Sequence, residues 1–152
     1  MSFDLSFLAP AAATVSVEEI AEWLASDERV GELSGRADSF GAVTAIGGDP
    51  WAAFLVEDVS DLDPDDLFVE GTPDELVLSG VRLEISYSTP VPIVHAVFEL
   101  AAAFAQRFGL VVVDDQADTV EPVEMDQLRA SWDEASAFAR AAFEQHLRNQ
   151  AG

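Results

Sequence analysis

The segment Glu75–Ser88, "ELVLSGVRLEISYS", shows the clearest β-strand pattern in the chain. Beyond Gly80, apolar and polar residues alternate, with Val81, Leu83, Ile85 and Tyr87 interleaved with Arg82, Glu84 and Ser86. A period of two directs the apolar side chains to one face of a sheet and the polar ones to the other. Gly80 predicts a bulge in this strand. The segment therefore indicates a long strand in a sheet that has one buried and one solvated face.

Other parts of the chain predict further strands. Alternation over Ser2–Ala9 indicates an N-terminal strand. The apolar runs Phe40–Ile46 and Trp51–Glu57 flank a Gly-Gly-Asp-Pro turn and predict a hairpin. The run Leu110–Val113, "LVVV", is short and unbroken, as expected of a buried strand. The polar stretch Ser26–Ser39 is expected to form a loop or an irregular turn.

Two helices are predicted from their end signals. Ser16 and Glu19 form a capping box, so a helix is expected to begin near Val17. A second helix has Pro92 near its start and Gly109 just past its end. It is apolar nearly all round, so we expect it to lie deep in the fold.

A long C-terminal helix is predicted over Val123–Asn149. Its apolar face recurs at steps of three and four residues, through Leu128, Trp132, Ala135, Ala139, Ala142 and His146, and is widened by Phe138 and Phe143. We expect this face to be core rather than a dimer seam. The helix is nevertheless the part of the chain most suited to project or to pair with another chain.

The resulting order is strand, helix, three strands, helix, strand, helix. This order predicts a single α+β domain over residues 1–152, with one layer of mostly antiparallel sheet packed by three helices.

Composition narrows the classes of function. The chain has 29 acidic residues, seven arginines and no lysine, a formal net charge of -22. Such a charge repels phosphates and anionic membranes, so neither direct nucleic-acid binding nor membrane binding is expected, whereas cationic partners are attracted. Solubility and adaptation to high salt remain open as plainer causes. The absence of cysteine excludes disulfides, thiolate metal sites and a cysteine nucleophile. The N-terminus lacks the basic region of a signal peptide, so a cytoplasmic location is expected.

The acidic residues form two clusters. Nine carboxylates lie between Glu57 and Glu75, and six lie from Asp114 to Asp126, with no basic residue inside either cluster. Asp61 opens a run of carboxylates spaced like a calcium loop, but the sixth position is not glycine and the twelfth is Thr72, so a calcium loop is rejected. If both clusters share one edge of the sheet, they would form a patch for a basic partner; two separate solvated loops are the alternative.

This reasoning selects ten partner-binding residues: Asp58, Asp61, Asp63, Asp65, Asp66, Phe68, Glu70, Asp114, Asp115 and Asp118. Phe68 and also Trp51 are aromatic residues that could anchor such a partner.

Signals for catalysis are weak. Asp114 and Asp115 follow a predicted buried strand, where a carboxylate could hold a metal or act as a base, with Asp118 or Glu121 beside it. Adjacent strand residues point to opposite faces, so only one of the pair could enter a given site. His95 and Glu99 lie one turn apart but are expected to be a polar stripe, and His146 is expected at the surface. No catalytic residue, metal site or cofactor is predicted.

Three segments resemble a diffuse group of small bacterial α+β proteins that begin Met-Ser-aromatic-Asp-Leu. They are Met1–Phe7 ("MSFDLSF"), Phe108–Gln116 ("FGLVVVDDQ") and the last helix with its Trp132. Some members of that group look like immunity proteins of toxin systems. The resemblance implies a toxin-neutralising role but brings no catalytic residues with it.

We therefore expect a non-catalytic, immunity-type inhibitor or adaptor that binds a basic toxin or effector. Imitation of nucleic acid by the carboxylates is a special case of this hypothesis. Two alternatives stay open: a structural subunit of a larger bacterial assembly, with homo-oligomer formation through the C-terminal helix, and a carboxylate-based metal enzyme centred on Asp114.

Overall fold

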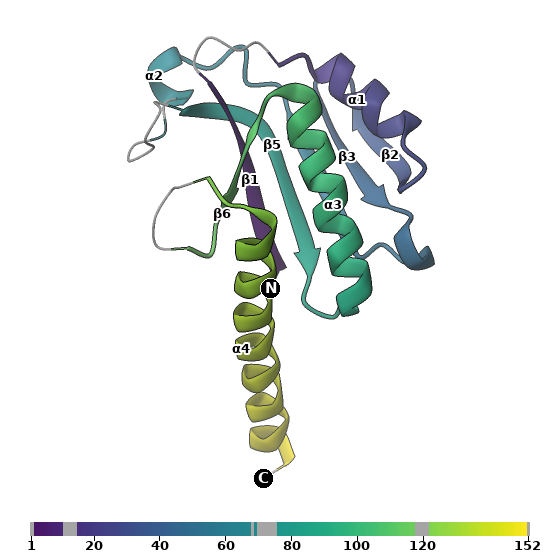
Figure 1. The fold of residues 1–152 in the computed structure, drawn as a ribbon, viewed down its shortest axis with the longest axis vertical. Helices are drawn as coiled ribbons and strands as arrows, with labels where there is room; N and C mark the ends of the chain where they lie inside the picture. The colour runs from purple at the N-terminus through teal and green to yellow at the C-terminus, as the bar shows by residue number, and fades with distance from the viewer. Residues whose placement is uncertain (1, 11–14, 68, 70–75, 118–121, 152) are drawn as a thin grey trace.

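The computed structural model describes residues 2–10, 15–67, 69, 76–117 and 122–151, with the side chains of residues 64 and 65 left aside. The strands are β1 (Ser2–Pro10), β2 (Val30–Arg36), β3 (Ser39–Thr44), β4 (Ala52–Glu57), β5 (Leu76–Ser86) and β6 (Val111–Asp114). The helices are α1 (Val17–Ser26), α2 (Pro64–Leu67), α3 (Val91–Phe108) and α4 (Met125–Ala151), with a short 3-10 turn η1 (Ile46–Gly48). Figure 1 shows their arrangement.

The strands form one sheet in the order β2-β3-β4-β5-β1-β6. Every neighbouring pair is antiparallel. The predicted α+β architecture, with an antiparallel sheet and a long C-terminal helix, is confirmed. The segment that showed the clearest strand pattern is β5, which lies inside the sheet between β4 and β1.

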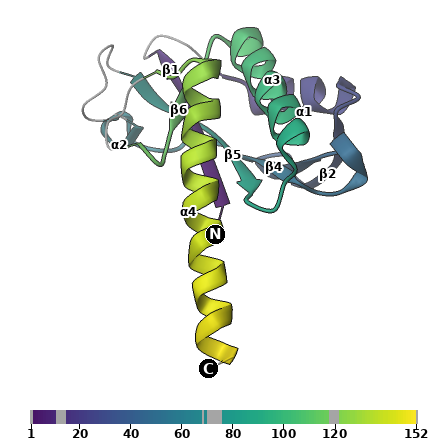
Figure 2. The same ribbon diagram turned by 60° about the horizontal axis from the view of Figure 1, so that its bottom comes forward.

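The helices α1, α3 and α4 lie on one face of this sheet (Figures 1 and 2). The inward side chains of β1 and β5 share one core cluster with these helices. Phe104 of α3 is central to it, with its ring centroid 5.0 Å from Phe7, 5.4 Å from Phe54 and 5.6 Å from Trp23. The alternation that predicted one buried face therefore reflects a sheet covered on one side.

Both predicted helix boundaries are confirmed. The Ser16 side chain caps α1 by accepting a hydrogen bond from the Glu19 amide at 3.3 Å. Gly109 ends α3 with a φ of 65°, a left-handed conformation that suits glycine.

The helix α3 buries one face rather than its whole circumference. Its buried residues are Val94, Val97, Phe98, Leu100, Ala101, Phe104 and Ala105, while Glu99 and Gln106 are exposed. Within the described residues, α3 is the one helix whose length and mean hydropathy of 1.2 would suit a membrane span. Its apolar face packs in the core beneath the sheet, so core packing accounts for that composition.

Two strand predictions need correction. The stretch Ser26–Ser39, expected to be a loop, contains β2, an edge strand that pairs only with β3. Val30 alone is buried in it, so β2 shows no apolar alternation. The run expected to be a buried strand forms β6, the opposite edge, and its residues Val111 and Val112 are only half-buried.

The helix α4 extends beyond the sheet, as Figures 1 and 2 show, and its predicted tendency to project is confirmed. Its first half buries Leu128, Trp132 and Ser136. The expectation that its whole apolar face is core is wrong beyond this point, because Phe138 and Phe143 are exposed. The sheet ends beneath the middle of the helix (Figure 1), so no strand remains to cover the rest.

The predicted bulge in β5 is confirmed. Phe7 of β1 lies opposite Val81, whereas the next residue, Leu8, lies opposite Leu78. Ser79 and Gly80 are thus extra residues, and the Ser79 hydroxyl donates a hydrogen bond to the Phe7 carbonyl. A Cβ atom at Gly80 would lie 2.0 Å from the Glu57 carbonyl oxygen.

We predict that Gly80→Ala destabilises the protein by roughly 2–4 kcal/mol, because the new methyl group meets fixed backbone and φ is positive. Gly41→Ala is the control: its Cβ would meet nothing closer than 3.7 Å, so stability should hold or rise. Urea unfolding of both variants measures the difference. Equal stability of the two variants would contradict this account of the bulge.

Candidate functional site

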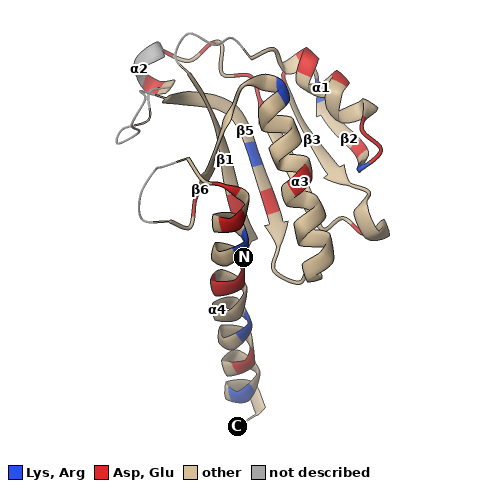
Figure 3. Ribbon diagram, viewed as in Figure 1, with Lys and Arg blue, Asp and Glu red and all other residues tan. Residues whose placement is uncertain are grey.

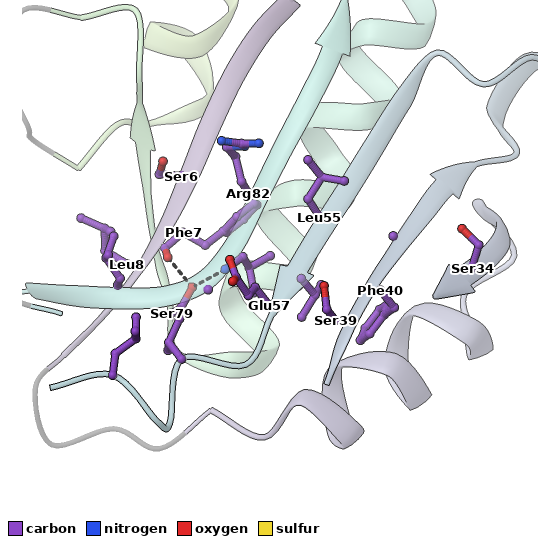
Figure 4. Close-up of a pocket in the computed structure, with 17 residues that line it drawn as sticks. Ser6, Phe7, Leu8, Ser34, Ser39, Phe40, Leu55, Glu57, Ser79 and Arg82 are labelled. Carbon is purple, nitrogen blue, oxygen red and sulfur yellow. Dashed lines mark hydrogen bonds between the residues drawn. The ribbon is translucent and has the colours of Figure 1, made fainter. Parts of the chain in front are cut away.

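The face of the sheet away from the helices carries a hollow of ≈ 600 Å³ (Figure 4). It extends from β2 to β1 and is crossed by the outward residues of β5. Arg82 lies at its middle, with Ser6 of β1 opposite on one side and Leu55 of β4 on the other. We call this hollow the sheet hollow.

The sheet hollow combines an apolar floor with a polar border. Its apolar side chains include Leu8, Leu55, Val59, Leu62 and Leu78. Leu62 and Leu78 are 47% and 41% exposed, which is unusual for large apolar residues of this fold. Gly41 adds no side chain, so the floor stays open above β3.

Arg82 is the one basic side chain that lines the sheet hollow. Its guanidinium lies 3.1 Å from the Glu84 carboxylate, and its side chain remains 52% exposed. An exposed, weakly held arginine beside apolar residues can form a directed ion pair with a ligand carboxylate.

The acidic loop, Glu57–Asp66, borders the sheet hollow. Val59 and Leu62 turn toward the hollow and line it. Exposed carboxylates surround these two residues: Glu57, Asp58, Asp61, Asp63 and Asp66. Asp58 accepts a hydrogen bond from the Ser60 amide at 2.9 Å, and this bond lowers the pKa of Asp58. The loop thus sets negative charge beside exposed leucines.

Three of the predicted partner-binding residues, Phe68, Glu70 and Asp118, lie outside the described residues, as does the Asp65 side chain. Trp51, the other suggested anchor, is half-buried and does not line the sheet hollow. Arg82, Leu78 and Gly41 were not selected from the sequence. The sequence held a signal for Arg82 and Leu78, because both belong to the strand with the clearest alternation.

Asp114 is not a surface residue, so its place among the predicted partner-binding residues is corrected. Its side chain is 4% exposed. Ser131 of α4 donates a hydrogen bond to one carboxylate oxygen, and the backbone N–H of Gln116 donates to the other at 2.9 Å. The Gln116 side chain also donates to Asp114 at 2.5 Å and to the Asp4 carbonyl at 3.0 Å. Asp114 therefore ties α4 to β6 and β1.

Asp115 points the other way, as expected for adjacent residues. The Ser6 hydroxyl lies 2.8 Å from both of its carboxylate oxygens, on the open face of the sheet. Loss of hydration raises the pKa of Asp115, and the charges of Asp4 and Asp114 add to this rise. The Ser6 hydrogen bond and the Arg82 charge act in the opposite direction.

Asp115 of the second cluster and the acidic loop both lie on the open face of the sheet but do not merge. Asp115 lies beside Asp4 on β1, and Glu57 lies beside Gly80 on β5. Three strand spacings and four residues of strand length separate Asp115 from Glu57, about 20 Å in all. Salt screens charges at this distance, because the Debye length is about 8 Å at physiological ionic strength. Asp115 therefore acts separately from Glu57 at the start of the acidic loop.

Other candidate residues show no catalytic arrangement in the described part of the chain. His95 is half-buried on α3, Glu99 is exposed, and no hydrogen bond joins them there. Residue His146 is exposed, as predicted. Across the described ranges, no three histidine, aspartate or glutamate side chains gather as metal ligands would.

Comparison with known proteins gives no relative: no protein-family model, curated protein or solved structure matches this chain.

We predict that Asp114→Ala destabilises the protein by about 2–4 kcal/mol, because partly buried donors of Ser131 and Gln116 lose their acceptor. Asp114→Asn keeps one acceptor oxygen and should lose less. Urea unfolding of both variants tests this. Stability equal to wild type for Asp114→Ala would show that the carboxylate does not hold α4.

A second prediction concerns Asp115 and pH. Its raised pKa in the fold means that protonation favours the folded state, an advantage that is present below the unfolded pKa of 3.8 and lost as pH rises through the folded pKa. Asp115→Asn removes the unfavourable ionisation. It should therefore equal or exceed wild type in stability at pH 7, by less than about 1 kcal/mol for so exposed a group.

The stabilities of wild type and Asp115→Asn should converge below pH 3.8, where Asp115 is protonated in both the folded and the unfolded state. Urea unfolding at pH 7 and pH 3 measures the change. A variant less stable than wild type at pH 7 but not at pH 3 would reverse the predicted sign.

Proposed function

We propose that this protein is a non-catalytic, cytoplasmic binding protein that holds a basic protein partner against the open face of its sheet. An immunity-type inhibitor or adaptor is the specific role we favour. One observation carries the proposal: the sheet is covered on one face only, and its other face combines a hollow, exposed leucines and a carboxylate-rich border.

Apolar contact supplies the anchor in this proposal. Leu62 and Leu78 are exposed beside the open floor at Gly41. A volume of ≈ 600 Å³ falls within the range of about 300–1,000 Å³ that is usual for ligand pockets. Large side chains of a partner that fill such a hollow would supply most of the binding energy.

Charged residues would speed the encounter with a basic partner and select among possible partners. The carboxylates of the acidic loop would steer a basic surface toward the sheet hollow and speed association. Arg82 lies inside the hollow and would repel a uniformly basic segment. It favours a partner that places one carboxylate among its basic residues, which is a source of specificity.

The metal-enzyme alternative has less support. Both oxygens of the Asp114 carboxylate already accept hydrogen bonds beneath α4. A metal at this residue would have to displace the contacts that hold the helix, so we do not propose one.

The test is affinity capture from an extract of the source cells at about 50 mM salt, where surface charge is little screened. Four proteins are compared. They are the wild type, a loop variant with Asp61, Asp63, Asp65 and Asp66 changed to Arg, a hollow variant Gly41→Leu, and a matched control with Glu22, Glu28, Asp133 and Glu134 changed to Arg. The control residues are exposed acids on α1, the turn after it and α4.

We expect a basic protein to bind wild type and control, and both the loop and hollow variants to lose at least about tenfold in affinity, or 1.4 kcal/mol. Calorimetry with the purified partner gives the values, and circular dichroism checks each fold. A partner that binds the loop variant as tightly as wild type would contradict the acidic-surface proposal. Equal losses in the loop variant and the control would reduce the effect to overall charge.

A further inference from the structure

We infer that the outer half of α4, Ala137–Ala151, forms a symmetric dimer with the outer half of a second copy of this chain. The proposal concerns a different surface from the sheet hollow and does not depend on the proposed function.

The outer half of α4 gathers exposed apolar side chains. Six large apolar residues are exposed in the described part of the chain. Leu62 and Leu78 line the sheet hollow. Phe143 and Leu147, one helical turn apart on the outer half of α4, are 62% and 48% exposed, whereas Phe138, 73% exposed, lies on another side of the same half. Large apolar side chains left in water on one short helical segment indicate an interaction surface.

A groove runs beneath this half of the helix. It measures ≈ 820 Å³ and lies between α4 and the β5–α3 connection, Ser86–Val91. The buried residues Trp132 and Ser136 continue outward on the same helix face, because Ala139, Phe143 and His146 follow at steps of three and four residues and line the groove. The face that packs on the sheet thus runs on with no sheet beneath it.

Charge argues that a second copy is the occupant. The outer half contains Arg140, Arg148 and one acidic residue, Glu144, a net charge of +1 with histidine neutral, so the rest of the chain carries -23. Two copies of so acidic a chain repel one another almost everywhere. The outer half of α4 projects away from the acidic body of the chain (Figures 2 and 3), so two copies can meet there with less repulsion.

A two-fold axis near Ala142 fits the side chains present. Two antiparallel helices related by this axis place Ala142 of each copy opposite Ala142 of the other, while Arg140 and Glu144, two residues to either side, point away from the contact. The small residues Ala139 and Ala142 permit close approach of the helices. Phe143 of each copy then enters the groove of the other.

The size of the contact sets its strength. Fifteen helical residues span about 22 Å, so two such halves and the groove walls reach only the lower end of the usual range of about 1,200–2,000 Å² for stable interfaces. We therefore expect a dissociation constant in the micromolar range. Salt should strengthen the dimer by screening the repulsion between the bodies, whereas salt should weaken binding of a basic partner.

Sedimentation velocity from about 5 to 500 μM protein, around the expected micromolar constant, tests the inference at 50 and 500 mM salt. Phe143→Glu should weaken the dimer at least tenfold. Phe138→Glu is the matched control, because it changes an exposed phenylalanine in the same way on a part of the helix that does not line the groove. Wild type that stays monomeric throughout, or equal effects of the two variants, would overturn the proposal.

Cross-linking gives an independent readout, since the chain has no cysteine of its own. Under mild oxidation, Ala142→Cys should form a disulfide-linked dimer because it lies at the expected axis. Ala141 is also exposed but does not line the groove, so Ala141→Cys should not form this dimer. Linkage of both variants at the same rate would contradict the two-fold axis. Because salt acts oppositely on the two surfaces, failure of this dimer leaves the proposed function standing, and the reverse also holds.

Discussion

The rest of this structure depends on one constraint: α1, α3 and α4 all pack on one face of a single antiparallel sheet, and none of these three helices covers the other face (Figure 1). The inward residues of β1, β4 and β5 meet Phe104 and its neighbours in one core. None of these three helices packs on the outward residues, so Arg82, Leu55 and Leu78 remain in contact with solvent. The sheet hollow is a direct consequence of this one-sided packing.

The position of α4 depends on a few contacts at one end. Trp132 lies in the core, 5.4 Å between ring centroids from Phe3, and its ring stacks on Tyr87 at 5.6 Å. The buried Asp114 carboxylate, bonded to Ser131 and Gln116, adds a polar tie to β6 and β1. Burying a carboxylate is unfavourable unless its hydrogen bonds are made, so this network also selects one orientation of the helix. The first half of α4 is thereby fixed against the sheet, whereas most of its second half is exposed to solvent.

The two candidate surfaces have opposite chemistry. The sheet hollow lies beside the acidic loop, and its partner should be basic. The outer half of α4 is nearly neutral, and the partner we propose for it is a second, equally acidic chain. A dimer joined through α4 would leave both sheet hollows free, since the helix projects away from the sheet (Figure 1). An inhibitor could then hold two partners at once and gain avidity from the pairing.

Local patterns in the sequence determined most of the elements by themselves. Alternation in β5, the Ser16 cap, the Gly109 end of α3 and the Gly80 bulge each follow from short-range sterics and hydrogen bonding, and each is present. The acidic loop was equally visible as a charge pattern. Only the tertiary structure decided that Ser26–Ser39 contains an edge strand, because a strand that buries only one of its seven residues shows no apolar period. It also buried Asp114 beneath α4 while exposing Phe143, two outcomes that depend on where the sheet ends. Residue type and spacing report what a side chain prefers, whereas its burial depends on which distant element comes to cover it.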